Sequence, residues 1–276
     1  MASGTLFVVA TPIGNLADAS PRALETLRGV DLVACEDTRT TRTLLARHGI
    51  EARTVPLHEH NERATAGRLV GALKQGRNVA LVSDAGTPAL SDPGALLVEQ
   101  AHRAGIRVSP LPGPSAAAAA FSAAGFAADR FLFAGFLPAS AAARRKALRD
   151  LDLPFPVILY EAPHRIAEAL EDIRQRFGGE REIVISRELT KKFEEVVRLP
   201  LAEAPAWLAA QPHRMQGEFV LVIAPGRPQP GLEIDADGVL DVLLGALPPS
   251  EAARLAARIT GAPKRELYRK ALERGK

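Results

Sequence analysis

Residues 79–94 read VALVSDAGTPALSDPG, and this stretch decides how the chain folds. Val79–Val82 is a short apolar run of the kind that forms a buried strand, and a polar loop follows it at once. Gly86 permits a backbone turn that other residues avoid, and it leaves backbone amides open to a ligand. Pro93 suits the first turn of a helix, whose N-terminus favours negative charge. A strand, a polar loop and a helix in succession are typical of an α/β fold.

Short apolar runs of the same kind recur along the chain, most of them 20 to 30 residues apart with helical patterns between many of them. Strands that alternate with helices predict an α/β fold with much parallel sheet. The runs are Leu6–Val9, Leu32–Ala34, Val79–Val82, Ile106–Val108, Phe131–Phe133, Val157–Tyr160, Ile183–Ile185 and Phe219–Ile223. Two helices are expected between them, one capped by Asn61 with Ala66, Leu69, Val70 and Leu73 on one face, and one started by Pro93 with Leu96, Leu97 and Ala101 facing inward.

Proline and glycine interrupt the chain at Pro110–Ser115, and we place a domain boundary at about residue 115. An N-terminal α/β domain then covers residues 1–115, and a C-terminal α/β domain covers residues 116–225. In the second domain, Glu194–Leu199 and Gly217–Ala224 are expected to form an antiparallel pair of strands. A second linker, Pro225–Pro230, leads into a small basic helical extension, so that linker and tail together cover residues 226–276.

The extension is predicted to contain three helices and to carry most of the basic charge. Gly238–Leu244 forms the first helix, Ser250 caps the second, Gly261 ends it and Pro263 starts the third. Residues 251–276 hold eight Lys or Arg and three Asp or Glu, a net charge of +5 in a chain whose formal net charge is +3. An anionic partner is therefore expected first at this tail, and the alternative is a solvated helical surface.

Cysteine use and hydropathy indicate the compartment. Cys35 is the single cysteine, so no internal disulfide can form, which suits a reducing compartment. The N-terminus has no basic segment before its short apolar run, and the longest weakly polar stretch, residues 113–128, is too short to cross a bilayer. We therefore expect a soluble, cytoplasmic protein without a membrane partner.

Polar and Gly/Pro clusters directly follow several of the apolar runs. In an open α/β sheet, ligands bind beyond the carboxyl ends of the strands, so these clusters are expected to surround one cleft. Asp84 is placed to accept hydrogen bonds from a ligand amine or hydroxyl. The alternative is a tight turn in which Asp84 and Asp92 act as caps. The clusters are Thr11–Asn15, Glu36–Arg39, Ser83–Pro88, Ser91–Gly94 and Glu161–Arg165.

Several familiar binding motifs are missing from the sequence. Neither G-x-G-x-x-G after the first strand nor G-x-x-x-x-G-K-[ST] occurs, which disfavours dinucleotide-fingerprint and P-loop chemistry. His58–Glu62 suggests metal ligands, but no third ligand stands at a suitable spacing, so no metal site is expected. This segment is either a polar loop that caps a helix or a loop that faces the substrate.

Three other reactive or charged groups have plain structural interpretations. Cys35 follows an apolar run and is expected to be a buried thiol, not a nucleophile. Residues 187–192, RELTKK, offer mixed charge in a loop, and an exposed strand connection is the alternative to a functional role. A solvated helix face is expected for the basic residues Arg144, Arg145, Lys146 and Arg149.

Eight motifs stand in order between about residue 5 and residue 223. They are Val8–Leu16, Glu36–Arg39, His58–Glu62, Leu81–Pro88 with Ser91–Gly94, Pro110–Pro114, Gly135–Pro138, Tyr160–Arg165 and Arg187–Lys191. Together they resemble the family of ribosomal RNA small subunit methyltransferase I, within the tetrapyrrole methylase superfamily. The basic tail resembles the C-terminal extension of that family.

The resemblance implies methylation of the ribose 2′-oxygen of a cytidine in 16S rRNA of the 30S ribosomal subunit, with S-adenosylmethionine as cofactor. It implies two α/β domains with S-adenosylmethionine in the cleft between them, in a homodimer. It also accounts for the missing glycine fingerprint, because this superfamily binds the cofactor without the usual Rossmann loop. Carried over residue by residue, the cofactor site comprises Pro12, Ile13, Asp84, Gly86, Thr87, Ser115, Ala116, Tyr160 and Glu161.

A ribose hydroxyl ionises far above pH 7, so its methylation needs a group that accepts the proton. The candidates for this base are His60, Glu36, Asp37 and Lys191, and His60 is favoured because an unshifted histidine titrates near pH 7. Arg39 and Arg165 are candidates to orient a phosphate or an acidic partner. The other candidate substrate contacts are Asn61 and, in the tail, Arg265, Arg269 and Lys270.

Two other functions remain open from the sequence. The first is a methylase that acts on a tetrapyrrole precursor, since the superfamily fold is shared. The second is a non-catalytic RNA-binding protein with a decayed cleft. The basic tail and His58–Glu62 favour RNA over a tetrapyrrole, and the intact motifs at several strand ends argue against decay.

Overall fold

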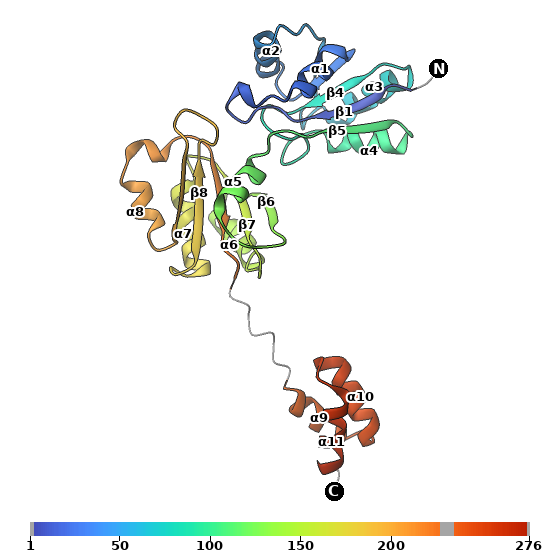
Figure 1. Cartoon of the computed structure of the whole chain (residues 1–276), viewed down its shortest axis with the longest axis vertical. Helices are drawn as coiled ribbons and strands as arrows, with labels where there is room; N and C mark the ends of the chain where they lie inside the picture. The colour runs from blue at the N-terminus through green and yellow to red at the C-terminus, as the bar shows by residue number, and fades with distance from the viewer. Residues whose placement is uncertain (1–2, 227–234, 275–276) are drawn as a thin grey trace. The chain divides into compact units, whose positions relative to one another are not determined.

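The computed structural model of the chain describes residues 3–226 and 235–274. Contacts divide the chain into two compact units, one that ends at Pro225 and one that begins at Gly226. The first unit contains two five-stranded sheets, and the described part of the second contains three helices. Figure 1 labels most of these elements along the chain. Residues 227–230 of the expected linker lie outside the described residues.

The first sheet is entirely parallel and has the strand order β3-β2-β4-β1-β5. Helices α1 and α2 cover one of its faces, and α3 and α4 cover the other (Figure 1). Burial on both faces explains why most of its strands read as continuous apolar runs. The elements are β1 Thr5–Val9, η1 Leu16–Asp18, α1 Pro21–Gly29, β2 Leu32–Cys35, α2 Thr38–Arg47, β3 Thr54–Pro56, α3 Glu62–Lys74, β4 Val79–Val82, α4 Ala95–Arg103 and β5 Arg107–Leu111.

The second sheet is mixed and has the strand order β6-β7-β10-β8-β9. Only β6 and β7 pair in parallel, and the other neighbours are antiparallel. Helices α6, α7 and α8 pack on one face and α5 on the other. The elements are α5 Ala116–Ala124, β6 Leu132–Phe136, α6 Ala141–Arg149, β7 Val157–Glu161, α7 Ile166–Phe177, β8 Glu182–Arg187, β9 Glu195–Pro200, α8 Ala204–Ala209, η2 Pro212–Met215 and β10 Phe219–Ile223.

All eight apolar runs coincide with strands, so the predicted α/β class and parallel sheet are confirmed. The predicted pairing in the second sheet was wrong: β9 and β10 are both strands, but each pairs with β8 and not with the other. The edge strand β3 was missed because it has three residues, none of them buried. Cys35 is buried and free, as expected.

The caps of α3 and α4 differ from the sequence prediction. Asn61 is the N-cap of α3, but its side chain makes no bond to the helix. Asn61 Oδ1 accepts a hydrogen bond from His58 N at 2.9 Å, which closes the turn before the helix. Glu62, in the first turn of α3, caps α4 instead, because its Oε1 accepts hydrogen bonds from Gly94 N and Leu96 N. The N-terminus of α4 therefore already holds a carboxylate of the chain itself.

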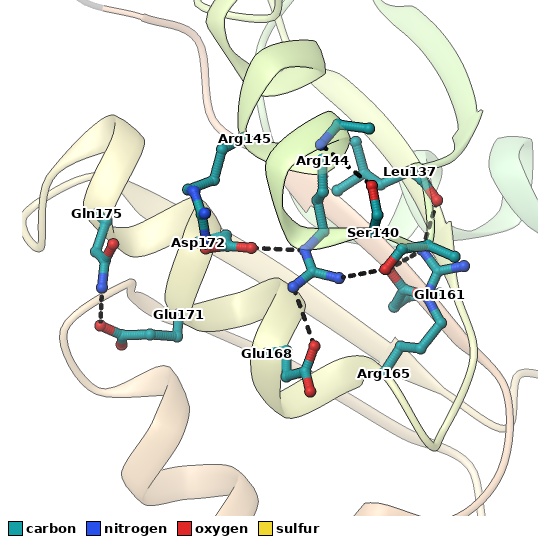
Figure 2. Close-up of polar contacts among 12 residues, drawn as sticks. Leu137, Ser140, Arg144, Arg145, Glu161, Arg165, Glu168, Glu171, Asp172 and Gln175 are labelled. Carbon is teal, nitrogen blue, oxygen red and sulfur yellow. Dashed lines mark hydrogen bonds and ion pairs between the residues drawn. The ribbon is translucent and has the colours of Figure 1, made fainter.

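Arg144 does not lie on a solvated face, contrary to the prediction. Its side chain is buried, and Nε donates to Asp172 Oδ2 at 2.6 Å while Nη2 bonds Glu168 Oε2 at 3.1 Å (Figure 2). Arg145 is half-exposed and approaches the second oxygen of Asp172 at 3.4 Å. A buried guanidinium needs such partners. Arg144 therefore ties α6 to α7 under the second sheet.

The second unit is a three-helix cluster of α9 Ala236–Leu244, α10 Pro249–Thr260 and α11 Lys264–Arg274. Its core contains Leu240, Ala252, Ala253, Ala256, Leu267 and Ala271. Gly261, at φ +75°, ends α10 as predicted. The predicted cap was wrong: Pro248 is the N-cap and Pro249 the first helical residue, which places Ser250 inside the helix. Among the described helices, none is long and apolar enough to cross a membrane.

Candidate active site

A cavity of about 400 Å³ lies in the first unit, lined by loops that follow strands of both sheets. Its size is within the roughly 300–1,000 Å³ of typical small-molecule sites. All the residues expected to hold the cofactor line it except Pro12, which lines a neighbouring groove. The expected residues in the cavity wall are Ile13, Asp84, Gly86, Thr87, Ser115, Ala116, Tyr160 and Glu161.

The loops after β1 and β4 are joined at the cavity by two backbone hydrogen bonds. Thr11 N donates to Gly86 O at 2.8 Å, and Gly86 N donates to Thr11 O at 3.1 Å. Gly86 has φ +85°, and a Cβ there would lie 3.3 Å from Ile13 Cγ2. Further along the loop, Ala89 and Ser91 also have positive φ, at 64° and 67°. Backbone strain of this kind persists where the surrounding structure holds a loop in one shape, as at ligand sites.

The second sheet contributes an aromatic wall. Tyr160, at the end of β7, packs edge-on against Phe136, with ring centroids 5.5 Å apart. The Tyr160 hydroxyl oxygen accepts a hydrogen bond from Ala117 N at 3.2 Å, which fixes the start of α5 beside the ring. Thr87 Oγ1 donates to Pro114 O at 3.0 Å and joins the β4 loop to the segment before α5. The cavity thus has one polar wall and one aromatic wall.

Carboxyl groups gather at the polar wall. Burial, and then the nearby charges of Glu36 and Asp84, raise the pKa of Asp92 to about 6 against the opposing effect of a hydrogen bond with Ser83. The pKa of Glu36 is also raised, by burial first and then by Asp84, while His58 acts in the opposite direction. Like charges that gather in this way are stabilised by a cationic ligand. Asp92 therefore marks a place in the cavity wall suited to positive charge.

Asp37 and Arg39 form an exposed ion pair beside this cluster. Arg39 Nη2 lies 2.7 Å from Asp37 Oδ2, and Nε contacts both carboxylate oxygens at 3.1 Å. The hydrogen bonds from Arg39 lower the pKa of Asp37 to about 2. Asp37 also caps α2. A carboxylate held this firmly in its charged form is a weak base.

His60 and Asn61 lie in the turn between β3 and α3. His60 is exposed, lines neither the cavity nor the groove, and packs edge-on against His58 with ring centroids 6.0 Å apart. Asn61 is occupied within the turn, where Nδ2 donates to Pro56 O at 3.2 Å. His58, not His60, is the histidine whose charge influences Glu36.

Lys191 joins the loop after β8 to Glu218, the residue before β10. Its Nζ lies 2.9 Å from Glu188 Oε1 and 3.0 Å from Glu218 Oε2, and Glu218 lines the cavity. Burial lowers the pKa of Lys191, but the hydrogen bonds to Glu188 and Glu218 outweigh it and raise the pKa. A Cβ at Gly14 would lie 2.4 Å from Lys191 Cγ, so the lysine stem passes directly over that glycine. Lys191 is therefore a charged bridge at neutral pH.

Glu161 and Arg165 form a partly buried ion pair next to the cavity. Arg165 Nε lies 3.2 Å from Glu161 Oε1, and Arg165 Nη2 donates to Leu137 O (Figure 2). Ala162 N also donates to Glu161 Oε1, at 2.9 Å. The guanidinium of Arg165 is therefore used within the second sheet, where it orients Glu161.

The three tail candidates fall into two groups. Lys270 Nζ pairs with Asp237 Oδ2 at 3.0 Å and joins α11 to α9. Arg265 and Arg269 are exposed and make no ion pair within residues 235–274. Of the three candidates, these two arginines are therefore the ones with free charge within residues 235–274.

Sequence reasoning left several cavity residues unassigned. Asp92 was considered only as a cap, although it stands in the Ser91–Gly94 polar cluster that pointed to the cleft. Phe136 lies in the Gly135–Pro138 motif and carried the same kind of signal. Leu189 lies in the Arg187–Lys191 motif, whereas Glu218 had no local signal, because only the antiparallel pairing of β8 and β10 brings it to the cavity.

Comparison with known proteins decides the family. Residues 5–205 match the family of tetrapyrrole (corrin/porphyrin) methylases, and residues 230–275 match the RsmI C-terminal HTH domain. Ribosomal RNA small subunit methyltransferase I of Pseudomonas aeruginosa is 53% identical over 278 residues, which is 99% of each chain. The chain belongs to the ribosomal RNA small subunit methyltransferase I family.

Other members and solved structures agree with this assignment. The ribosomal RNA small subunit methyltransferase I of Escherichia coli O157:H7 is 49% identical and covers 98% of this chain and 95% of its own. Among solved structures, a diphthine synthase has a TM-score of 0.60 at 20% identity, covering 80% of this chain and 90% of that chain. The methyltransferase CobJ has a TM-score of 0.60 at 21% identity, covering 81% and 95%. These structures confirm the tetrapyrrole methylase fold of the family, here with a helical C-terminal unit.

Proposed function

We propose that this chain is an S-adenosylmethionine-dependent methyltransferase that modifies the ribose 2′-oxygen of a cytidine in 16S rRNA of the small ribosomal subunit. The observation that carries the proposal is similarity along the whole chain. The ribosomal RNA small subunit methyltransferase I of Pseudomonas aeruginosa matches 99% of it, so the match includes both the residues of the cavity and the helical unit. A methylase of another substrate class would be expected to share only the first unit.

The cavity fits S-adenosylmethionine on its own chemistry. S-adenosylmethionine supplies, when bound, a methyl group on a positively charged sulfur that is a good leaving group. Asp84 and Asp92 give the polar wall the negative charge that stabilises such a cation. Tyr160 and Phe136 provide aromatic faces against which a nucleobase can pack.

Asp92 is the residue that we propose as the acceptor of the ribose proton. Its carboxyl group lines the cavity, and its pKa of about 6 is close to neutral pH. A general base is most effective when its pKa lies near the operating pH. One carboxylate oxygen of Asp92 would accept the proton of the ribose 2′-hydroxyl as the 2′-oxygen is methylated.

The bases suggested by the sequence are weaker proposals. His60 is exposed outside the cavity wall, and Asp37 has a pKa of about 2. Lys191 stays protonated because it pairs with two carboxylates. Glu36 remains the second candidate, since its pKa is raised and its charge acts on Asp92.

A transfer experiment tests the proposal directly. Labelled S-adenosylmethionine is supplied with unmodified 30S subunits, with naked 16S rRNA or with a mixture of tetrapyrrole precursors. We expect label on 30S subunits, at the ribose of one cytidine when the modified nucleotides are mapped. Label on the tetrapyrroles alone would replace this function with the competing methylase. RNA binding without any transfer would indicate a non-catalytic binding protein.

We also propose a domain boundary at about residue 115 within the first unit. It is supported by the elements on either side, since β5 ends at Leu111 and α5 packs on the second sheet.

We further propose a homodimer in the cytoplasm, acting on 16S rRNA within the 30S subunit. Light scattering on the purified full chain tests the dimer, and a monomer mass would remove it.

A further inference from the structure

A second cavity adjoins the first one and is not used by the proposed reaction. This groove, of about 340 Å³, lies between the loop after β1 and helix α2. Asp84 lines both the groove and the main cavity, so the two spaces meet at one carboxylate. The remaining groove residues are Thr11, Pro12, Leu16, Thr40, Thr43 and Leu44.

The helix that forms one side of the groove has an unusual composition. α2 reads TRTTRTLLAR, with three arginines, four threonines and no acidic residue. Thr40, Thr43 and Leu44 line the groove, and Arg47 continues the same helical stripe one turn further along. Within residues 3–226, the exposed Arg47 makes no ion pair or side-chain hydrogen bond. Arg47 therefore places a free cation on α2 one turn beyond the groove-lining residues of that helix, and the Asp84 carboxylate lines the groove itself.

The polar groups along the groove and at Arg47 suit the two polar parts of a ribonucleotide, its ribose hydroxyls and its phosphate. Asp84 Oδ1 accepts a hydrogen bond from Asp37 N at 3.1 Å, and its second oxygen is free to accept one from a ribose hydroxyl. The threonine hydroxyls and the Arg47 guanidinium are donors of the kind that bind phosphate oxygens. Arg39 is less available, because its guanidinium is held by Asp37.

We propose that this groove binds the single-stranded RNA backbone next to the target nucleotide and leads its ribose to the main cavity. The inference rests on the proposed function and deepens it, because it assigns the RNA a binding site on the first unit, separate from the basic tail. A single-stranded RNA can place one sugar and one phosphate in such a groove.

Arg42 offers a matched control on the same helix. It is exposed, carries the same charge and makes no ion pair in the part of the chain described up to residue 226. It lies five residues before Arg47, about 140° away around the helix axis. Arg47→Gln and Arg42→Gln therefore remove equal charge from opposite sides of α2.

Affinity for unmodified 30S subunits is measured for both variants over a range of salt concentrations, with S-adenosylmethionine affinity measured by calorimetry. We expect Arg47→Gln to weaken RNA binding about tenfold, the loss for one charge-assisted hydrogen bond. Its log–log salt slope should fall by about 0.7, as for one single-strand phosphate contact. Arg42→Gln should leave both quantities unchanged, and both variants should bind S-adenosylmethionine like the wild type. Equal effects of the two variants, or no effect of either, would overturn the groove assignment.

A photo-crosslinking residue at Thr40 or at Arg42 gives an independent readout without methyl transfer. These positions lie about 160° apart around the axis. Crosslinks from position 40 to nucleotides beside the methylated cytidine, and none from position 42, would support the groove. Crosslinks to S-adenosylmethionine from position 40 would show instead that the groove belongs to the cofactor. Failure of the wild-type chain to methylate 30S subunits would remove the proposed function, while the crosslinks would still decide whether RNA occupies the groove.

Discussion

Asp37 N donates a hydrogen bond to Asp84 Oδ1 at 3.1 Å, and this contact joins the end of β2 to the end of β4. The bond fixes one oxygen of the only carboxylate that, among the described residues, lines both the cavity and the groove. Because a backbone amide orients the side chain, its position does not depend on another flexible group. Asp84 is thereby directed toward ligands from a rigid sheet edge.

Because Asp37 N holds Asp84 in place, two substitutions can separate the effect of the charge of Asp84 from the effect of its position. Asp84→Asn keeps an oxygen that can accept from Asp37 N but removes the negative charge. We expect its S-adenosylmethionine affinity to fall about tenfold, in line with the loss of one charge-assisted contact. Asp84→Ala should lose more, because the hydrogen bond that orders the loop disappears as well. Calorimetric affinities equal to the wild type for both variants would contradict a role in cofactor binding.

Asp92→Asn tests the proposed base. We expect kcat at saturating substrates to fall by about 10²–10⁴, the usual contribution of a general base. In the wild type, kcat/KM, which reports the ligand-free enzyme, should rise with pH through about 6, where Asp92 ionises, and the variant should lack this rise. Single-turnover methyl transfer from pH 5 to 8 measures both effects. His60→Gln is the control and should keep the rise, whereas its loss in that variant would favour His60 as the base.

The carboxyl group of Asp92 should lower the free energy of unfolding at neutral pH. Its pKa in the folded chain, about 6, lies above the ordinary value of 3.8, so protonation favours the folded state. The stability it contributes is present below about pH 4 and is lost as pH rises through 6. Because Asp92 is only partly buried, we expect Asp92→Asn to be more stable than the wild type by about 1–2 kcal/mol at pH 8. Urea unfolding at pH 4 and pH 8 tests this, and a difference independent of pH would contradict it.

Gly14→Ala probes the bridge made by Lys191. The added Cβ would lie 2.4 Å from Lys191 Cγ and 3.1 Å from Leu189 O, so the lysine must move away from Glu218. We expect a loss of about 1–3 kcal/mol in the free energy of unfolding, as for other overpacked sites. Gly67→Ala, in the middle of α3 with nothing within 4 Å, is the control and should gain about 0.5–1 kcal/mol. Similar effects of the two substitutions would show that the lysine stem adapts freely.

Arg144 and Asp172 form a buried pair whose removal should be costly one residue at a time (Figure 2). Arg144→Leu leaves the Asp172 carboxylate without its main partner and should cost about 3–5 kcal/mol. Adding Asp172→Leu should restore much of this loss, because no buried charge is then left unpaired, while Glu168 and Arg145 are exposed to water. Arg145→Ala, at a half-exposed partner of the same carboxylate, should cost less than about 1 kcal/mol. Denaturant unfolding of the three variants measures these losses in the free energy of unfolding. An Arg144→Leu variant as stable as the wild type would mean that water reaches Asp172.

The sequence determined the elements that depend on local pattern. Apolar runs such as Val79–Val82 form strands because a strand covered on both faces must be apolar along its whole length. Gly261 ends α10 because a glycine adopts the left-handed conformation without a steric penalty. The motifs at the strand ends located most of the cavity wall for a similar reason, since parallel strands place their carboxyl ends at one edge.

Only the tertiary structure decided which polar groups meet. The pairing of β8 with both β9 and β10 brings Glu218 to the cavity, and no local pattern encodes that pairing. The pKa of Asp92 depends on Glu36, which is far away in sequence and near only in the fold. Arg144 reads as a surface residue until Asp172 is placed beside it. Local sequence sets backbone conformation over a few residues, whereas burial and charge interactions act through space, so these roles follow from the assembled sheets.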